Sequence, residues 1–447
     1  MSTRRDFIKE TVAGVAAFSV GSVLPGFSAR SYGRISGAND RIRIGVIGVN
    51  SRGLALAKGY AQLPDCDVKY ICDVDAHALE KCCGEVAKIS GTTPKGFRDL
   101  RDMLQAPDFD AVVIATPDHW HAPAAILAMK AGKHVYLEKP TSHSPAENEL
   151  LIKAAAKYNR VVQAGNQRRS WPNVIEAIEA VRSGEIGTVR YAKSWYMNNR
   201  PSIGTGKVVP VPDHIDWDLW QGPAPRVKEF HDNYIHYNWH WFWRWGTGEA
   251  LNNGTHFVDI VRWGLGVDYP TAVASVGGRY RFQDDWETPD SQMITFQFGD
   301  RASGSWEGRS CNSVPVDGYP TGVAFYGDKG ALFLGGGNEY KIVDMKGKEV
   351  KRVTSTMTFA ANDLKNPSKS LDAIHFRNWF DGIREGRRLN SGIVEACIST
   401  QLVQLGNIAQ RVGRSLKVDP DTGRILGDRG ANKLWSRDYE KGWEPKL

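Results

Sequence analysis

A short apolar segment, a glycine-containing turn and a helical pattern follow one another near the start of the regular part of this chain. Ile42–Ile47 has the length and apolar content of a buried strand, and Leu54–Leu63 has the apolar spacing of a helix. The turn between them places Gly48, Asn50 and Gly53 at the three glycine positions of a dinucleotide-binding turn. The chain is therefore expected to pass sharply from strand to helix, as in parallel α/β sheets that bind a nucleotide at a helix N-terminus.

The positions of this turn fit a pyrophosphate with one departure. Gly48 allows the tight turn, and Gly53 lets the helix pack closely on the strand. Asn50 replaces the middle glycine, but asparagine tolerates a positive φ better than most residues with a side chain. Ser51 and Arg52 are candidates for further phosphate contacts. The turn predicts dinucleotide binding, against the alternative of a glycine-rich turn in another doubly wound fold.

An acidic residue sets the expected cofactor. Asp73 follows the apolar segment Val68–Cys72 and lies twenty residues beyond Gly53. A carboxylate there accepts hydrogen bonds from the ribose hydroxyls of adenosine. Because the same charge repels the 2′-phosphate of NADP, the sequence predicts NAD, with NADP less favoured.

The alternation of strands and helices continues to about residue 165. Further strands are expected at Val68–Cys72, Ala111–Ala115, His134–Leu137 and Val161–Ala164, and helices at Ala76–Ile89, Ala122–Ala131 and Pro145–Tyr158. Strands that alternate with helices imply a parallel sheet with right-handed crossovers. We therefore predict a doubly wound NAD-binding α/β domain of the Rossmann type at residues 42–165.

The pattern changes after residue 165. Polar and apolar residues alternate in Val189–Trp195, Thr271–Arg281, Gln292–Phe298 and Ala302–Glu307, and helical spacing returns at 368–415. Alternation of this kind is typical of an antiparallel sheet with one exposed face. Residues 166–447 are therefore predicted to form an α+β domain with a large open, mostly antiparallel sheet, for substrate binding and oligomerisation.

The first 29 residues indicate export. Arg4 and Arg5 precede a short apolar stretch, Val12–Leu24, and small residues follow it. This order is typical of a twin-arginine signal, against the alternative of a chance basic amphipathic N-terminus. We expect export to the periplasm by the twin-arginine machinery, a linker at residues 30–41, and no stable membrane anchor.

Composition excludes several other classes of function. The net charge of +7 is scattered, without a block of Lys or Arg, so nucleic acid is not expected as a partner. The six cysteines lack the spacing of zinc ligands and are read as free thiols. No metal site is predicted.

Several motifs, in order, carry a resemblance to a known family. They are Glu138-Lys139-Pro140, Thr116–His121, Gln163–Arg169, Gly246–Asp259 and Leu405–Ala409. Together they resemble the glucose–fructose oxidoreductase/inositol dehydrogenase/rhizopine-catabolism (Gfo/Idh/MocA) family. The cofactor contacts proposed on this basis and from the strand ends are Thr116, Pro117, His119, His121, Glu138, Lys139, Asn166 and Gln167. For His119 and His121 helix capping is the alternative.

The resemblance also implies the catalytic residues. It places Lys139 beside the nicotinamide, where it hydrogen-bonds the reacting hydroxyl; a solvated surface lysine is the alternative. His256 matches the acid/base position, and an imidazole that titrates near neutrality suits this role, although a core or capping histidine is possible. Asn252 stands where the family has aspartate, so it can hold the substrate or orient His256 but cannot relay a proton.

Aromatic residues are dense between Trp217 and Trp245. Trp239, Trp241, Trp243 and Trp245 would share one face of an extended segment. Such rings suit the C–H faces of a sugar, and core packing is the alternative. Arg168, Tyr196, Tyr237 and Arg244 are the candidate substrate contacts.

Three functions compete. The first is an NAD-dependent dehydrogenase that transfers hydride between a ring hydroxyl of a sugar, glycoside or cyclitol and a tightly bound nicotinamide. The second is redox-neutral glycoside cleavage, against which the presence of Lys139 argues, because related NAD-dependent glycosidases generally lack it. The third is a non-catalytic sugar- or cofactor-binding protein. By analogy with the family, we expect a homo-oligomer.

Overall fold

The computed structural model describes residues 41–336, 339–354 and 371–447. Residues 42–447 form one compact unit. The predicted export signal and the linker before Arg41 lie outside the described residues. Among the helices that are described, none has both the length and the apolar content that a membrane crossing needs.

The first sheet has six parallel strands in the order β3-β2-β1-β4-β5-β6. The strands are β1 (Ile42–Ile47), β2 (Cys66–Cys72), β3 (Lys95–Phe97), β4 (Ala111–Ile114), β5 (His134–Leu137) and β6 (Val162–Ala164). The helices are α3 (Arg52–Ala61), α4 (Ala76–Ser90), α5 (Leu100–Leu104), α6 (Asp118–Lys130) and α7 (Pro145–Lys157). The doubly wound parallel sheet is confirmed, and the strand order reverses between β1 and β4, where such sheets bind ligands.

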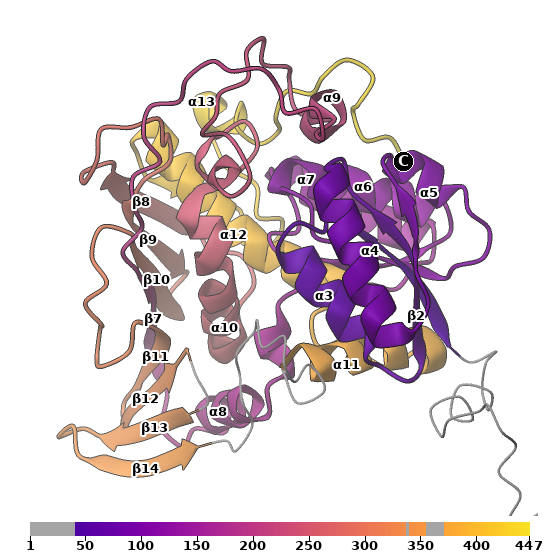
Figure 1. The fold of residues 1–447 in the computed structure, drawn as a ribbon. Coiled ribbons are helices and arrows are strands. Elements are labelled where there is room, and N and C mark those ends of the chain that lie inside the picture. The colour runs from indigo at the N-terminus through magenta and orange to yellow at the C-terminus, as the bar shows by residue number, and fades with distance from the viewer. Residues whose placement is uncertain (1–40, 337–338, 355–370) are drawn as a thin grey trace, which may run out of the picture. The chain divides into compact units, whose positions relative to one another are not determined.

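Helices cover both faces of this sheet (Figure 1). Apolar side chains of α5, α6 and α7 form the core on one face, and those of α3 and α4 form the core on the other. The second core also contains Phe376 and Trp379 from α11 (Leu371–Glu385), whose rings lie against Tyr60 and Tyr136. The core on this face of the parallel sheet is therefore completed by a helix from the C-terminal part of the chain.

The second sheet has nine strands in the order β14-β13-β12-β11-β7-β10-β9-β8-β15. They are β7 (Val189–Met197), β8 (Ala272–Gly278), β9 (Ser291–Phe298), β10 (Ala302–Arg309), β11 (Thr321–Gly327), β12 (Gly330–Gly335), β13 (Glu339–Asp344), β14 (Glu349–Thr354) and β15 (Leu416–Lys417). Among the described strand pairs of this sheet, only β7–β10 is parallel. The expected mostly antiparallel sheet is confirmed.

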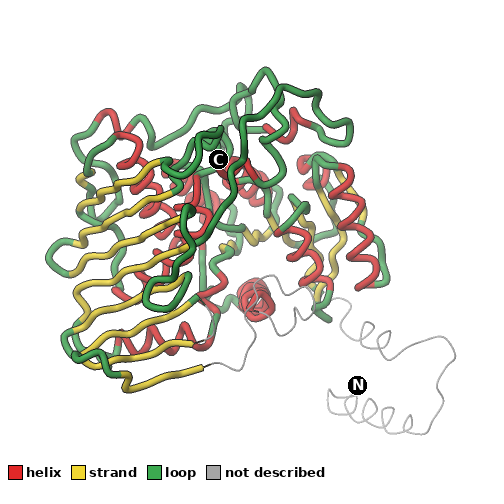
Figure 2. The backbone as a smooth tube through the Cα atoms, turned by 60° about the vertical axis from the view of Figure 1, so that its left-hand side comes forward, coloured by secondary structure: helices red, strands yellow, loops and turns green. Residues whose placement is uncertain are grey.

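Helices cover one face of the second sheet and leave the other open (Figure 2). The covering helices are α8 (Pro172–Arg182), α10 (Thr255–Leu265) and α12 (Ile393–Val412). Residues of β9 alternate accordingly: Ile294 and Phe296 are buried under the helices, whereas Met293 is 44% exposed on the other face. Alternation of this kind is what the sequence showed in this region.

Glycine is required at the first turn of the chain. Gly48 has a φ of +79°, and a Cβ on Gly53 would lie 1.8 Å from the Gly48 carbonyl oxygen. Asn50, by contrast, is not among the described residues with positive φ, so the tolerance of asparagine for that conformation is not needed here.

Gly53→Ala should therefore lower the free energy of unfolding by at least ~1–3 kcal/mol, because α3 must move away from the β1 turn. Gly84→Ala in α4 is the matched control: its Cβ meets nothing within 4 Å, and alanine stabilises a helix by roughly 0.5–1 kcal/mol relative to glycine. Urea unfolding of both variants measures the difference. Equal stability of the two variants would contradict the packing argument.

Candidate active site

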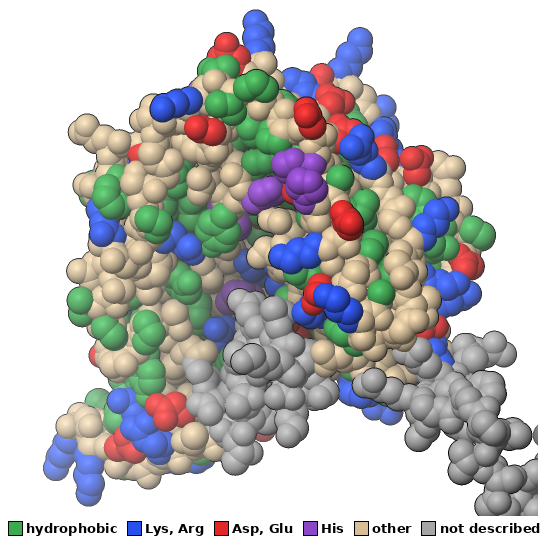
Figure 3. All heavy atoms as spheres, in the orientation of Figure 1, with side chains coloured by type: hydrophobic (Ala, Val, Ile, Leu, Met, Phe, Trp, Pro, Cys, Tyr) green, Lys and Arg blue, Asp and Glu red, His purple; other side chains and the backbone are tan. Residues whose placement is uncertain are grey.

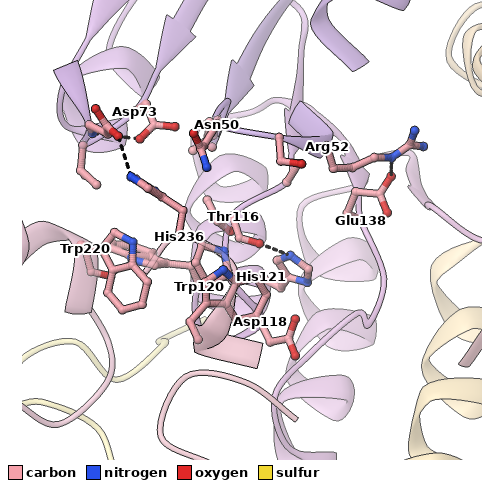
Figure 4. Close-up of a pocket in the computed structure, with 18 of the residues that line it drawn as sticks. Asn50, Arg52, Asp73, Thr116, Asp118, Trp120, His121, Glu138, Trp220 and His236 are labelled. Atoms are coloured by element: carbon pink, nitrogen blue, oxygen red, sulfur yellow. Dashed lines mark hydrogen bonds and ion pairs between the residues drawn. The ribbon is translucent and has the colours of Figure 1, made fainter. Parts of the chain in front are cut away.

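A cavity of about 740 Å³ lies at the carboxyl edge of the parallel sheet (Figure 4). Of the residues predicted from the sequence, those that line it are Gly48, Asn50, Ser51, Arg52, Asp73, Thr116, Pro117, His121, Glu138, Lys139, Gln167, Tyr237, Asn252 and His256. Six others do not: Gly53, His119, Asn166, Arg168, Tyr196 and Arg244. Cavities of this size hold cofactor-sized ligands.

The end of the cavity beside β2 fits an adenosine ribose. The Asp73 carboxylate accepts hydrogen bonds from the backbone N–H of Val49 (2.6 Å) and of Asp75 (2.9 Å), which fix it next to the glycine turn. Burial raises the pKa of Asp73 to about 6. Its oxygens keep lone pairs with which ribose hydroxyls can bond. The glycine turn and this carboxylate together are the arrangement that an NAD molecule requires.

The affinity for NAD should depend on this carboxylate. Above a pH of about 6 Asp73 is ionised and accepts hydroxyl hydrogen bonds; below it, we expect affinity to fall about tenfold per pH unit as a proton competes. Stability without NAD changes in the opposite direction: the pKa in the folded protein exceeds the unfolded value, so acidification through pH 6 relieves the cost of burying the charge. Calorimetric titration of NAD from pH 7 to pH 5 tests this. Asp73→Asn should bind weakly without the pH dependence, and a persistent dependence in that variant would contradict the assignment.

Arg52 forms ion pairs with two carboxylates of the protein. Its guanidinium donates to Glu138 Oε1 (2.8 Å) and to both carboxylate oxygens of Asp372 in α11 (2.7 and 2.8 Å). The two carboxylates raise the pKa of Arg52 well above its ordinary value despite burial. Figure 4 shows Arg52 and Glu138 joined at the rim of the cavity. A phosphate group bound by Arg52 would thus compete with two carboxylates that already neutralise the charge of this guanidinium.

The two histidines after β4 have different environments. Helix α6 begins at Asp118, four residues earlier than predicted, so both histidines lie in its first turns. His121 lines the cavity, its ring held between the carbonyl oxygens of Thr116 (2.8 Å) and Pro140 (2.5 Å). His119 is fully buried against the Trp220 carbonyl, 3.0 Å away, and does not line the cavity. Burial lowers its pKa to about 3, so its environment is that of a core residue.

Lys139 and Asn252 are bonded to each other inside the cavity. Lys139, directly after β5, donates from Nζ to the backbone oxygen of Asn252 (2.6 Å) and to its Oδ1 (3.1 Å). Burial lowers the pKa of Lys139. The surface-lysine alternative is thereby excluded. Asn252 lies in a π-helical turn (η3, Ala250–Gly254) that leads into α10, and such turns are frequent at functional sites. Asn252 therefore positions Lys139.

His256 lines the same cavity from the first turn of α10. Burial, assisted by the nearby charge of Lys139, lowers the pKa of His256 well below its ordinary value. Burial, which the sequence pattern does not reveal, thus moves the pKa of this imidazole away from the neutral range expected from the sequence. Its Nδ1 is buried without a hydrogen-bond partner among the described residues. A neutral imidazole with a free nitrogen can accept a proton.

One of the four predicted substrate contacts lines the cavity, and three do not. Tyr237 lines the cavity, and its hydroxyl accepts from the Asn252 amide at 3.4 Å. Arg168 lies between the rings of Trp171 and Phe257, outside the cavity lining, with Tyr196 nearby. Arg244 is exposed and donates to the Pro225 carbonyl.

The aromatic segment is not extended. Residues Asn238–Trp241 form a 3₁₀ turn (η2), so the four alternate tryptophans do not share one face. Trp241 and Trp245 are buried, as core packing predicts, while Trp239 lines the cavity. Asp118, Trp120 and His236 also line the cavity and were not predicted from the sequence. Asp118 and Trp120 lie within the motif Thr116–His121, whereas no motif of the sequence contains His236.

Fold and cavity together define a dinucleotide-binding protein of the oxidoreductase class. Residues 42–166 match the family model described as "Oxidoreductase family, NAD-binding Rossmann fold", and residues 174–333 match the "GFO/IDH/MocA C-terminal domain". The two models together match well over half of the chain. The chain belongs to the Gfo/Idh/MocA oxidoreductase family and has its NAD-binding Rossmann domain.

Individual relatives share low sequence identity with this chain. A "Glycosyl hydrolase family 109 protein" of Shewanella sp. (strain W3-18-1) is 27% identical over 210 residues, which are 44% of this chain. One from Saccharopolyspora erythraea is also 27% identical, over 212 residues. The matched region spans about half of each of these relatives, 46% of their length.

Solved structures share the fold over most of the chain. The WlbA dehydrogenase from Bordetella pertussis, in complex with NADH and UDP-GlcNAcA, has a TM-score of 0.63 at 19% identity and covers 85% of this chain and 99% of its own. A levoglucosan dehydrogenase in complex with NADH and levoglucosan has a TM-score of 0.64 at 20% identity, with 84% and 99% covered. These likenesses establish the fold.

Proposed function

We propose that this protein transfers hydride between the carbon of a ring hydroxyl, in a sugar, glycoside or cyclitol, and the nicotinamide of NAD. The observation that carries the proposal is the position of Lys139: its ammonium group is held by Asn252 in the cavity that His256 also lines. Two solved structures that contain sugar ligands, WlbA and levoglucosan dehydrogenase, support the same substrate class by their fold.

The residues of the cavity have separate roles in this reaction. NAD held by the glycine turn and Asp73 would supply the acceptor for the hydride of the substrate carbon. Neutral His256 takes the proton of the hydroxyl on that carbon, so that a carbonyl forms as the C–H and O–H bonds break. Lys139 donates a hydrogen bond to the same oxygen and stabilises the negative charge that develops on it. Asn252 keeps Lys139 oriented, and the adjacent Tyr237 and Trp239 offer a hydroxyl and a flat apolar face to the ring.

A second candidate is redox-neutral cleavage of a glycoside. It is favoured by the glycosyl hydrolase family 109 relatives, which match 44% of this chain. In this reaction oxidation of a ring carbon acidifies the neighbouring C–H, elimination releases the aglycone, and the hydride is then returned. Lys139 and His256 would serve the oxidation in the same way, so the two candidates differ only in the steps after the oxidation.

One experiment separates the candidates. The protein is loaded with NAD and mixed with a panel of free sugars, cyclitols and aryl glycosides, while absorbance and released aglycone are monitored together. A lasting NADH absorbance without aglycone supports the dehydrogenase. Aglycone release without lasting NADH assigns the glycosidase reaction. Neither signal with any compound would contradict both.

Export of the chain, predicted from residues 1–29, is part of this proposal. The periplasm has no obvious pool of free NAD, so the cofactor should remain bound and be reoxidised by a second substrate. Protein purified with its cofactor should keep NAD through extensive dialysis. An empty protein that requires added NAD would contradict this part.

A further inference from the structure

A cluster of metal-ligand side chains lies at one edge of the cofactor cavity. A carboxylate oxygen of Asp75 and ring nitrogens of His214 and His236 all lie within 4.8 Å of one another. Asp75 and His236 also line the cavity, beside the carboxylate predicted to hold the adenosine ribose. Figure 4 shows His236 reaching toward the end of β2 next to Asp73, and Figure 3 shows histidines gathered on this face of the molecule.

The cluster is held together by main-chain contacts as well as by its side chains. Asp75 is the N-cap of α4: its Oδ1 accepts from the backbone N–H of His77 (2.9 Å) and Ala78 (3.2 Å). Its Oδ2 is left to face His236 Nε2 at 3.2 Å. That separation is close to the distance between two ligands of one tetrahedral zinc ion, whose bonds are about 2.0–2.2 Å long.

His214 is brought to this place by a short antiparallel bridge. Asp75 pairs with Ile215 across it, and the Ala76 N–H donates to the His214 carbonyl at 2.9 Å. The His214 ring stacks on the His77 ring, with centroids 4.1 Å apart, which limits its rotation. Two of the three ligands are thus fixed by backbone geometry before any ion binds.

We propose that Asp75, His214 and His236 bind a divalent transition metal, with Zn²⁺ as the best match to two imidazoles and a carboxylate. Asp75 belongs to the Rossmann domain, at the N-cap of α4, whereas both histidines belong to the segment between β7 and α10, part of which also lines the cavity. The ion would therefore fasten that segment over the adenosine end of the cavity. Cofactor release should slow when the metal is bound.

The first test is a zinc titration of the full chain, free of any histidine tag and stripped with a chelator. We expect one Zn²⁺ per chain by calorimetry and by metal analysis after dialysis. Asp75→Asn keeps an oxygen for the helix cap but removes the anionic ligand, and His236→Ala removes an imidazole. Loss of either ligand should weaken binding by more than the roughly 10–100-fold that loss of an outer-shell partner costs. His231→Ala, on the same segment but stacked on Tyr234 outside the cluster, should bind as the parent does.

The spectrum of a Co²⁺-substituted protein and the rate of NADH dissociation test the proposal further. Substitution with Co²⁺ should give visible bands of nitrogen and oxygen ligation; a thiolate charge-transfer band would assign the metal to cysteines and overturn the site. NADH dissociation from the zinc-loaded holoenzyme, measured by stopped-flow fluorescence, should be slower than from the stripped protein, and His236→Ala should abolish the difference. Absence of zinc binding in the parent chain, or equal binding in the Asp75 and His236 variants, would overturn the proposal.

Discussion

Replacing Lys139 by alanine should lower the rate of hydride transfer by roughly 10²–10³-fold, the usual cost of removing one donor to a developing oxyanion. Asn252 accepts two hydrogen bonds from the Lys139 ammonium group inside the cavity, and alanine removes that group. Rapid mixing of the NAD complex with a substrate from the panel, with NADH absorbance as the signal, measures the rate of the chemical step.

The control for this variant is Lys153→Ala, which removes an exposed lysine from α7 and should leave the rate unchanged. NAD binding should persist in both variants, because the glycine turn and Asp73 are untouched. If the Lys139 variant kept the full rate, the role assigned to the Lys139 ammonium group would be wrong.

Replacing His256 by alanine should lower the same rate by about 10²–10⁴-fold, the usual contribution of a general base. The substitution leaves a space in the cavity, so added imidazole should restore part of the activity, an effect that a purely structural histidine would not show. His231→Ala, with its ring on Tyr234, is the surface control.

The pH profile gives an independent check of His256. Because burial holds its pKa well below the ordinary value, the base stays unprotonated through neutrality. At saturating NAD, the rate should show no histidine titration near pH 6.5 in the parent protein. A full loss of rate through that pH would contradict the buried, neutral imidazole.

The local pattern of the sequence predicted most elements of the Rossmann domain. Strand-length apolar runs and the spacing of Gly48 and Gly53 depend on neighbours a few residues away, and they predicted β1, α3 and the turn between them. Short elements such as β3 and α5 were missed because three to five residues carry too little periodicity. Five strands of the second sheet, β11–β15, were also not predicted.

Features that depend on distant contacts could not be read from the sequence. The Arg52–Asp372 pair joins residues 320 positions apart, so a candidate phosphate ligand could not be recognised as an internal ion pair. The burial that lowers the pKa of His256 also depends on distant contacts, as does the contact between Asp75 and His236. Neither could be predicted from the sequence. The alternate tryptophans after Tyr237 suggested a strand because period alone does not distinguish a strand face from a 3₁₀ turn.

Transfer of deuterium from the substrate to the nicotinamide tests hydride transfer in this cavity. A responsive sugar carrying deuterium at the oxidised ring carbon is mixed with the NAD-loaded protein, and the nicotinamide is recovered for mass spectrometry after a single turnover. We expect NADH that carries the substrate's deuterium, with Lys139→Ala and His256→Ala forming it far more slowly. Turnover of the sugar with no deuterium on the nicotinamide at any time would contradict hydride transfer in this cavity.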